Sequence, residues 1–349
     1  MSTKILITDP LSEKGIEFLK ESGLEVIYKP NASVDEIKIH LSDISGWIIR
    51  SGTRITEQNI SDAKKLQIIG RAGVGTDNID IDSATKSGVV VMNVPDGNTI
   101  SAAEHTVAMM MSLSRNIHLG HMSLISGNWD RNKLVGNELR GKTLGVVGLG
   151  KIGREVIKRT LSYDMKILGF DPFVSQDSFD ENEVKIVTLD ELTTSSDYIT
   201  LHVPMMASTK NLFNLDRLKM MKSNAKIINV ARGGILNEED LAYALNNDII
   251  SGAALDVFVS EPLDSKSDLL NTKNILLTPH LGASTYEAKE GVSQGICNQI
   301  IEYFSHAKLI NALNIPVSDP SILKKMTPYY RLTEKMGNIL SQLSEGPIK

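Results

Sequence analysis

Short, mostly apolar runs alternate with polar or helical segments along almost the whole chain. Five such runs, rich in Ile and Val, occur before residue 93. They lie at 5–7, 24–27, 47–49, 66–69 and 89–91. Runs this short and β-branched, separated by helices, are typical of strands in a parallel sheet that is covered on both faces. The pattern therefore predicts an α/β domain in the first part of the chain.

A second series of runs occupies the middle of the chain. Runs with the length of strands occur at 144–147, 165–171, 184–187, 198–204, 225–230, 251–257 and 275–277. Helical patterns separate most of them, as at 151–163 and 238–245. Strands that alternate with helices indicate a second domain with its own parallel sheet.

A long helical pattern, from Thr285 to about Phe304, follows the last of these strands. We expect it to carry the chain back to the first domain. The expected domains are then residues 1–98 with 290–320, which are discontinuous in sequence, and residues 99–289. Residues 321–349 form a helical tail, in which apolar residues recur on one face at 332, 336, 339, 340 and 343.

The second domain is expected to begin with a helix. Thr99 or Ser101 is available as its N-cap, and Glu104 occupies the position of the capping-box partner of Ser101. The pattern continues to about Leu119. Three successive methionines at 109–111 exceed what one apolar stripe requires, so this helix should be buried on several sides.

A glycine motif, Gly148-Leu-Gly-Lys-Ile-Gly153, lies between a strand and a helix. In this setting Gly148 permits a tight turn, Gly150 lets a pyrophosphate approach the backbone at the positive end of the helix dipole, and Gly153 lets the helix pack closely. Asp171 ends the next strand, 18 residues past Gly153, where a carboxylate accepts hydrogen bonds from ribose hydroxyls. Because it would repel a 2′-phosphate, the motif predicts NAD rather than NADP.

The other cofactor contacts are expected beside these elements and at further strand ends of the same domain. His202 ends a strand and should line the cofactor crevice, because ligands of such sheets bind beyond the carboxyl ends of the strands. The remaining residues expected to bind the cofactor are Lys151, Ile152, Arg154, Pro172, Val203, Pro204, Thr209, Ala231, Asp256 and Gly282.

Three polar residues, Arg232, Glu261 and His280, stand at successive strand ends of the second domain. Hydride transfer from a hydroxy acid needs a cation to hold the carboxylate, a base to remove the hydroxyl proton, and an acid partner that orients an imidazole base. Arg232, His280 and Glu261 can fill these three roles. In the alternative interpretation, His280 caps the following helix and Glu261 belongs to a surface turn.

Two arginines follow adjacent strands of the first domain. Arg50 lies in the loop 50–53, and Arg71 lies in a glycine-rich loop that ends at Gly75. Glycines beside Arg71 permit close approach of the backbone to a ligand, and two guanidinium groups can hold an anionic substrate. Alternatively, both are solvated surface arginines.

Composition narrows the classes of function. A chain of 349 residues is long for one core and suggests two domains. Its net charge of −5, without a long basic run, favours neither nucleic acid nor a membrane surface. The start of the chain lacks a signal-peptide pattern, and the single cysteine, Cys297, fits a reducing cytoplasm. His118 and His121 lack a third ligand nearby, so no metal is expected.

These motifs together resemble those of the D-isomer-specific 2-hydroxyacid dehydrogenases, over roughly residues 4–315. The resemblance rests on Gly148–Gly153, Asn229-Val-Ala-Arg-Gly-Gly234, Glu261-Pro262 and Pro279-His-Leu-Gly-Ala-Ser-Thr285. It implies that Arg232, Glu261 and His280 are catalytic. His280 would take the proton of the C2 hydroxyl as the hydride passes to NAD, and Glu261 would be hydrogen-bonded to the imidazole.

The resemblance also implies an architecture and an assembly. It predicts two Rossmann-like, doubly wound parallel-sheet domains, with NAD bound by residues 99–289 and substrate by residues 1–98 with 290–320. Members of the family form homodimers or tetramers, in which the segment around Trp129 reaches across the dimer. Residues 321–349 resemble the beginning of the regulatory region that longer members carry.

Within the family the chain is most similar to members that oxidise D-3-phosphoglycerate to 3-phosphohydroxypyruvate, the first step of L-serine biosynthesis. Four arginines, namely Arg50, Arg71, Arg131 and Arg232, suit a substrate that carries about three negative charges. Lactate would need only one arginine. The residues that the resemblance assigns to the substrate are Arg50, Ser51, Arg71, Gly73, Val74, Gly75, Asn98 and Arg131, the last of them serving the neighbouring subunit.

Other functions stay open at this point. Within the same chemistry the alternative is a glyoxylate, hydroxypyruvate or D-lactate type of dehydrogenase. A formate dehydrogenase is disfavoured, because this type is expected to carry glutamine at position 261. An alternative from another class is a non-catalytic protein of the same fold that senses NAD.

Overall fold

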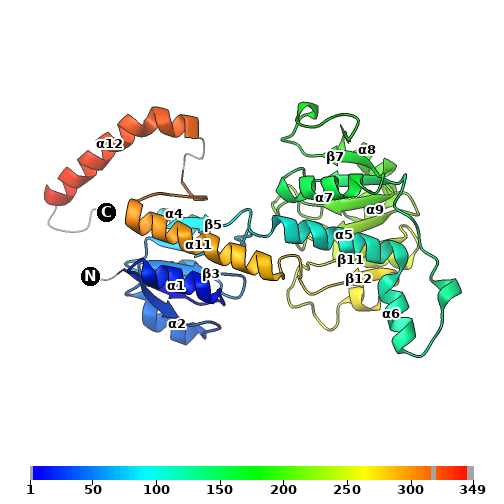
Figure 1. Cartoon of the computed structure of the whole chain (residues 1–349), viewed down its shortest axis with the longest axis horizontal. Coiled ribbons are helices and arrows are strands. Elements are labelled where there is room, and N and C mark those ends of the chain that lie inside the picture. The colour runs from blue at the N-terminus through cyan, green and yellow to red at the C-terminus, as the bar shows by residue number, and fades with distance from the viewer. Residues whose placement is uncertain (1–2, 316–319, 344–349) are drawn as a thin grey trace. The chain divides into compact units, whose positions relative to one another are not determined.

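The computed structural model describes residues 3–315 and 320–343. The chain divides into two compact units, of which the first contains residues up to Pro95 and from Val292 onward, and the second contains Asp96–Gly291. Each unit is built on one sheet whose paired strands all run parallel (Figure 1). The predicted fold class, α/β with two Rossmann-like doubly wound sheets, is confirmed.

The sheet of the first unit has the strand order β2-β1-β3-β4-β5. Its strands are β1 (Lys4–Ile7), β2 (Glu25–Tyr28), β3 (Gly46–Ile49), β4 (Ile68–Arg71) and β5 (Val90–Asn93). The helices are α1 (Glu13–Glu21), α2 (Val34–Leu41), α3 (Glu57–Asp62), α4 (Ile81–Lys86) and the long α11 (Tyr286–His306), which begins in the second unit.

Helices cover both faces of this sheet. On one face, Leu19 of α1 and Ile296 of α11 pack with strand residues such as Ile5. On the other, Leu41 of α2 and Ile60 of α3 pack against the opposite side of the strands. This two-sided burial is why the strands read as continuous apolar runs in the sequence.

Residues that follow α11 return to the sheet of the first unit. Ala312 forms an antiparallel bridge with Met92 of β5, and the Asn314 side chain accepts a hydrogen bond from the Val91 backbone at 2.9 Å. A last helix, α12 (Pro320–Leu343), begins before the predicted tail does. The apolar positions on its predicted face are all more than half exposed, and residues 316–319 and 344–349 of the predicted segments lie outside the described residues.

The sheet of the second unit has the order β12-β11-β10-β9-β6-β7-β8. Its strands are β6 (Thr143–Val147), β7 (Lys166–Phe170), β8 (Val184–Ile186), β9 (Tyr198–Leu201), β10 (Lys226–Asn229), β11 (Gly252–Leu255) and β12 (Ile275–Leu277). The chain begins this sheet at β6, adds β7 and β8 on one side of it, and then returns to add β9 on the other side. The order of the strands along the chain therefore reverses between β6 and β9. In sheets of this type, ligands bind beyond the carboxyl ends of the strands at such a reversal.

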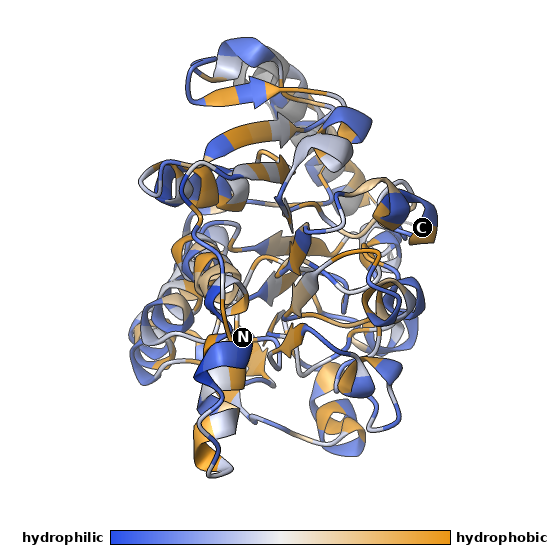
Figure 2. Cartoon of the chain, turned by 90° about the vertical axis from the view of Figure 1, so that its right-hand side faces the viewer, coloured by the Kyte–Doolittle hydropathy of each residue, from blue (hydrophilic) through white to orange (hydrophobic). Residues whose placement is uncertain are grey.

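The helices of the second unit also lie on two faces. They are α5 (Thr99–Arg115), α6 (Ile117–Ile125), α7 (Lys151–Leu161), α8 (Leu189–Ser195), α9 (Leu215–Met220) and α10 (Glu238–Asn246), with short 3-10 turns at Arg131–Lys133, Gln176–Ser178 and Asp268–Asn271. Met110 of α5 and Val156 of α7 belong to one core, and Leu218 of α9 and Leu241 of α10 belong to the other. In Figure 2, which looks onto this unit, the central strands are mostly apolar and the helices carry both colours.

The start and end of α5 differ from the prediction. The helix begins at Thr99, and its N-cap residue, Asn98, makes no side-chain capping bond. The hydroxyl of Ser101 instead donates to Gly282 O at 2.8 Å, and Glu104 forms an ion pair with Arg159, so the predicted capping box is wrong. The helix also stops before Leu119, because Asn116 adopts a left-handed conformation with φ 52°. Gly282 and Arg159, the partners of Ser101 and Glu104, lie far from this helix in the sequence, so no local pattern reveals them.

No helix in the described part of the chain is both long and apolar enough to cross a membrane.

Candidate active site

The glycine loop connects β6 to α7 in a closely packed turn. Gly148 has φ 97°, and a Cβ atom there would lie 2.5 Å from His202 O, so a larger residue would not fit. A Cβ atom on Gly153 would lie 2.1 Å from Gly148 O, which places the first turn of α7 directly against the loop. At Gly150, by contrast, a Cβ atom would meet nothing within 4 Å. The loop is thus open only at its middle glycine.

The open glycine is also the N-cap of α7. Gly150 has no side chain, so the first backbone N–H groups of this 11-residue helix receive no side-chain cap. Uncapped N–H groups and the positive end of the helix dipole together form a site for an anion. The geometry fits the pyrophosphate of a dinucleotide.

Asp171 follows β7 and reaches the glycine loop. Its carboxylate accepts a hydrogen bond from Leu149 N at 2.9 Å through Oδ2, and another from Phe173 N at 2.9 Å through Oδ1. A carboxylate has about four acceptor positions, so each oxygen can still accept a hydroxyl. The position suits a ribose beside the phosphate site, with exposed Pro172 next to it.

Two cations of α7 were predicted to bind the cofactor, and both have partners within the unit. Lys151 forms an ion pair with Asp96. Arg154 donates from Nε to Leu149 O at 3.0 Å, and its guanidinium lies 4.3 Å from the centroid of the Phe179 ring. Arg154 therefore ties the glycine loop to the helix. A cofactor contact by Lys151, Arg154 or the half-buried Ile152 stays a prediction.

The loop after β9 lies next to the glycine loop through the contact between His202 and Gly148. The imidazole Nε2 of His202 is 2.9 Å from Thr200 Oγ1. Burial lowers the pKa of His202 to about 3, so the ring is neutral at neutral pH. Further along, Thr209 Oγ1 donates to Pro204 O at 2.6 Å and thereby closes the loop that also contains Val203.

His280 and Glu261 come together, as the sequence predicted. The imidazole Nδ1 of His280 is 2.6 Å from Glu261 Oε2. Glu261 Oε1 also accepts from Phe258 N at 3.0 Å. Burial raises the pKa of Glu261, but the hydrogen bonds from His280 and Phe258 outweigh it and leave the pKa below its ordinary value.

Arg232 lies in the loop after β10, the strand next to β11. Asn229 holds this loop, because its side chain donates to Arg232 O at 2.9 Å and accepts from Ala231 N at 3.0 Å. A Cβ atom on Gly233 would lie 1.9 Å from Phe258 O, so only glycine allows this loop to touch the one that carries Glu261. The loops of Arg232, Glu261 and His280 thus gather at one edge of the sheet.

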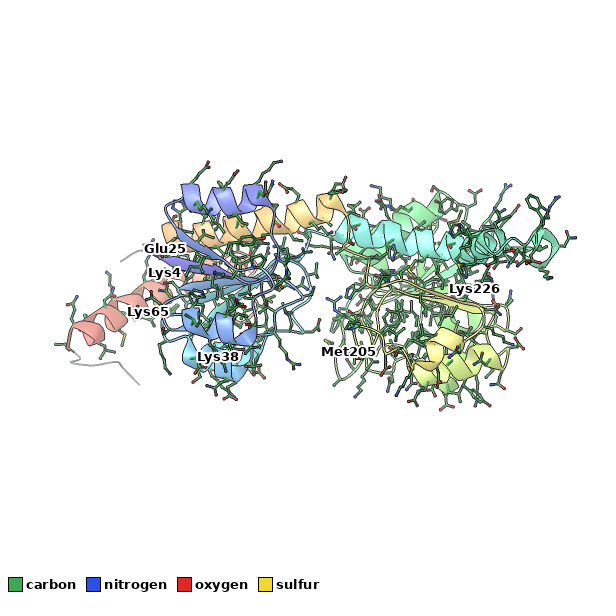
Figure 3. All side chains as sticks on the ribbon, turned by 90° about the horizontal axis from the view of Figure 1, so that it is seen from below. Lys4, Glu25, Lys38, Lys65, Met205 and Lys226 are labelled. Atoms are coloured by element: carbon green, nitrogen blue, oxygen red, sulfur yellow. The ribbon has the colours of Figure 1, made fainter. Side chains whose placement is uncertain are left out.

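This edge is the carboxyl edge of the strands. In Figure 3, Met205, which follows β9, and Lys226, the first residue of β10, mark the carboxyl and amino edges of the sheet. The Met205 side chain comes within 3.0 Å of the Cβ position of Gly234, so it borders the Arg232 loop.

Two carboxylates beside these loops, those of Asp256 and Glu238, accept backbone hydrogen bonds that the sequence did not predict. Asp256, predicted only as a cofactor residue, is fully buried, and its carboxylate accepts from Leu281 N at 2.7 Å and Gly282 N at 2.8 Å. Glu238, the first residue of α10, accepts from Val259 N at 2.6 Å. Burial, followed by the charge of Glu261, raises the pKa of Glu238 despite this bond. Both carboxylates hold backbone of the candidate site.

In the first unit, Arg50 follows β3, and its backbone is held on two sides. Its N–H donates to Asp9 Oδ2 at 2.5 Å, and its carbonyl accepts from Asn78 Nδ2 at 2.6 Å. Its guanidinium donates weakly to Pro10 O at 3.4 Å, and the neighbouring Ser51 is exposed. The structure therefore fixes the loop that presents Arg50.

Arg71 is the last residue of β4, adjacent to β3. A Cβ atom on Gly73, which has φ 148°, would lie 1.6 Å from Arg71 Nη1, so glycine here makes room for the guanidinium. Asn93 Nδ2 donates to Val74 O at 2.7 Å and fixes the loop that continues to Gly75. Arg50 and Arg71 thus follow paired strands, as expected.

The last two predicted substrate residues belong to the second unit. Asn98 precedes α5, and its Oδ1 atom is buried without a hydrogen-bond partner among the described residues. Arg131 lies in an exposed 3-10 turn, two residues after Trp129, which is 82% exposed. Their predicted roles, like those of the other site residues, stay predictions.

Comparison with known sequences identifies the class of protein. Residues 107–282, about half of the chain, match the D-isomer specific 2-hydroxyacid dehydrogenase, NAD binding domain. The chain therefore belongs to the D-isomer specific 2-hydroxyacid dehydrogenases. The match confirms NAD as the predicted cofactor, and the glycine loop and Asp171 lie inside the matched residues.

The similar proteins narrow the comparison further. The chain is 44% identical to D-3-phosphoglycerate dehydrogenase of Synechocystis sp. and 40% identical to that of Bacillus subtilis, in both cases over 99% of its length. It covers only 62% and 65% of these relatives, less than two thirds of their length. Among solved structures, an NAD-dependent formate dehydrogenase from Staphylococcus aureus in complex with NAD aligns with a TM-score of 0.80 and 30% identity, over 89% of this chain and 99% of that one.

Proposed function

We propose that the protein oxidises D-3-phosphoglycerate to 3-phosphohydroxypyruvate with NAD, the first step of L-serine biosynthesis. The observation that carries the proposal is the 2.6 Å hydrogen bond between His280 and Glu261 at the carboxyl edge of an NAD-binding domain. The similarity to phosphoglycerate dehydrogenases over 99% of the chain supports the choice of substrate.

The geometry supports Nε2 of His280 as the proton-transfer atom. Glu261 has a lowered pKa, so at neutral pH it is an ionised carboxylate that can only accept hydrogen bonds. Nδ1 of His280 must then carry a proton, which leaves Nε2 as the free base for the C2 hydroxyl proton. NAD, when bound, supplies the acceptor for the hydride. Arg232 would hold the substrate carboxylate.

Two arginines of the first unit are proposed to bind the substrate. We assign Arg50 and Arg71 to the phosphate and carboxylate, because they follow two paired strands and their loops are fixed by Asp9 and Asn93. A guanidinium group binds a phosphate or a carboxylate through two parallel hydrogen bonds. Residues 1–98 with 290–320 would therefore form a substrate domain, and Ser51, Val74, Gly75 and Asn98 would complete the site.

The test is NADH oxidation by the purified protein with a panel of 2-oxo acids. 3-Phosphohydroxypyruvate should be reduced with the highest kcat/KM. The alternative is a glyoxylate, hydroxypyruvate or D-lactate type of enzyme, and efficient reduction of glyoxylate without 3-phosphohydroxypyruvate would establish that alternative instead. Replacement of His280 by alanine should abolish most turnover, whereas a protein that only senses NAD would be unaffected.

A matched pair of variants tests the phosphate assignment. Arg50→Gln or Arg71→Gln should raise KM for 3-phosphohydroxypyruvate by about 10- to 100-fold, since each removes a charge-assisted pair worth about 1.5–3 kcal/mol. The neighbouring Arg54→Gln serves as the control, because Arg54 lies on the same loop without a predicted substrate role. KM for unphosphorylated hydroxypyruvate should change less in the Arg50 and Arg71 variants.

We propose further that the protein acts in the cytoplasm as a homodimer or a tetramer of such dimers. Support for self-association comes from α6 and the loop after it, where Ile125 is 64% and Trp129 is 82% exposed. An apolar surface of this kind is typical of a protein–protein interface. In that dimer Arg131 would reach the neighbouring substrate site.

A further inference from the structure

We propose that His105 is a positioning residue for this reaction, because it orients the loop that carries His280 through the buried carboxylate of Asp256. The inference rests on the proposed function, which gives His280 the proton transfer. His105 lies in the middle of α5, away from the strand ends that carry the three predicted catalytic residues.

Asp256 accepts hydrogen bonds from four of the five residues of the loop 278–282. Its Oδ1 accepts from Leu281 N at 2.7 Å and from Thr278 Oγ1 at 2.5 Å, and its Oδ2 accepts from Gly282 N at 2.8 Å. Its backbone carbonyl accepts from His280 N at 2.9 Å. One buried side chain therefore sets the path of the backbone on both sides of His280.

The backbone of His280 needs such support. It has φ 53°, in the left-handed region that residues other than glycine rarely adopt. Such a conformation persists only where the surroundings impose it, and it is common at functional sites. The bonds to Asp256 from residues before and after His280 impose it here, and they aim the imidazole at Glu261.

His105 is a further hydrogen-bond partner of the Asp256 carboxylate. Its Nε2 lies 3.1 Å from Asp256 Oδ1 and 3.2 Å from Thr278 Oγ1. Because an ionised carboxylate only accepts hydrogen bonds, Nε2 must carry a proton. A fully buried carboxylate needs donors for its lone pairs, and a missing donor leaves a costly uncompensated group. Without His105 the carboxylate keeps its bonds to Thr278, Leu281 and Gly282 but lacks one donor. A rotation of the carboxylate or an entering water would replace that donor, and either change alters its bonds to the loop.

One face of α5 contacts the loop 278–282. Ser101, His105 and Met109 follow one another at intervals of four residues, so they lie on the same side of the helix. Ser101 donates to Gly282 O at 2.8 Å, and the Thr278 hydroxyl lies 3.6 Å from Met109 Sδ. The helix thus contacts the loop at both its ends, and His105 lies between these two contacts.

Steady-state kinetics of the full chain test the proposal. With saturating NADH and 3-phosphohydroxypyruvate, His105→Ala should lower kcat by about 10- to 100-fold, because a displacement of about 1 Å at a reacting group can cost this much. His105→Gln should recover most of the loss, since its amide nitrogen can donate from the place of Nε2. The control is His306→Ala, an exposed residue at the end of α11, which should leave kcat unchanged.

A second background separates positioning from a general loss of structure. In a His280→Ala protein, His105→Ala should cause no further loss of kcat, because the group that it positions is absent. An equal fold-loss in both backgrounds, or equal losses in the Ala and Gln variants, would overturn the proposal.

A measurement without turnover keeps the proposal separate from the proposed function. Hydrogen–deuterium exchange of the backbone amides at 278–282 should become faster in His105→Ala, while exchange in β6 should stay the same. Unchanged exchange at 278–282 would refute the positioning role. A wild-type protein that reduces no 2-oxo acid would refute the proposed reaction alone.

Discussion

The tautomer of the His280 imidazole is decided by one neighbour. Glu261 accepts hydrogen bonds through both oxygens, and these bonds keep it ionised despite partial burial. A single negative charge then fixes the imidazole tautomer, with the proton on Nδ1. The tautomer, and not only the presence of a histidine, makes Nε2 available for the substrate.

Glu261→Gln should therefore lower kcat by about 10²- to 10⁴-fold, the usual range for misdirected acid–base catalysis. The glutamine amide can donate to Nδ1 and so place the proton on Nε2, which is then no longer a base. Glu261→Asp, which keeps the charge, should retain more activity than Glu261→Gln. The measurement is kcat at saturating substrate, and equal activity of the two variants would contradict the explanation.

His202 should make the fold sensitive to acid. Burial lowers its pKa from 6.5 to about 3, so between these values the unfolded chain binds a proton that the folded chain does not. Stability contributed by the neutral ring is fully present above pH 6.5 and is lost as the pH falls towards 3, at no more than about 1.4 kcal/mol per pH unit. The free energy of unfolding, measured with urea, should fall less between pH 6.5 and pH 4.5 in His202→Gln than in the wild type. His306→Gln, at an exposed site, should behave like the wild type.

The three residues proposed as catalytic stand out in the sequence because they occur in short motifs at strand ends. Arg232, Glu261 and His280 each follow an apolar run and stand beside glycine or proline, which is a local pattern. His105 could not be predicted, since its partner Asp256 is 151 positions away and no local pattern marks His105 within its helix. The same holds for Glu238, which is 21 positions from Val259.

The glycine loop and α7 form one device in which each glycine meets a different constraint. The Cβ position of Gly153 is blocked by the backbone of Gly148, whereas that of Gly150 is open. Gly150 has φ −71°, a value that alanine adopts without strain. Packing therefore requires glycine at 153, whereas the fold itself does not require it at 150.

This contrast gives a matched pair of variants. Gly150→Ala should leave the thermal unfolding temperature nearly unchanged but raise the Kd for NADH by at least about tenfold, because a methyl group takes the place of the pyrophosphate. Gly153→Ala should instead destabilise the fold by about 1–3 kcal/mol through overpacking. Fluorescence titration with NADH and differential scanning calorimetry measure the two effects. A Gly150→Ala protein that binds NADH normally would place the phosphates elsewhere.

The strands were predictable and the helix ends were not, for different reasons. Central strands, such as β3 in the first unit and β9 and β10 in the second, are buried at every position and produce apolar runs that can be seen in the sequence. The start of α5 depends instead on Ser101, whose hydroxyl bonds to the distant Gly282 and not to its own helix. The break at Asn116 depends on one residue in a left-handed conformation, which asparagine tolerates but does not require.

The assembly should depend on α6, a helix without a buried residue in this structure. Leu124 and Ile125 are 59% and 64% exposed, so a double change to Asp should separate the subunits by burying charge in the interface. Light scattering after size-exclusion chromatography should show the mass fall to one chain. Ile39→Asp on α2 is the control, since Ile39 is 75% exposed but lies on the other unit. A variant that keeps the wild-type mass would place the interface elsewhere.

The first unit takes its core from both ends of the sequence. Ile5 and Ile7 of its first strand pack with Ile296 and Ile300 of α11, and residues 96–291 lie between them in the chain. During translation the ribosome must therefore release the whole second unit before the helix that covers this sheet face exists. The second unit is continuous and can fold as soon as it emerges, while the N-terminal strands wait with an apolar face exposed. Incomplete synthesis would thus endanger the first unit, whose bare sheet face is prone to aggregation and to capture by chaperones.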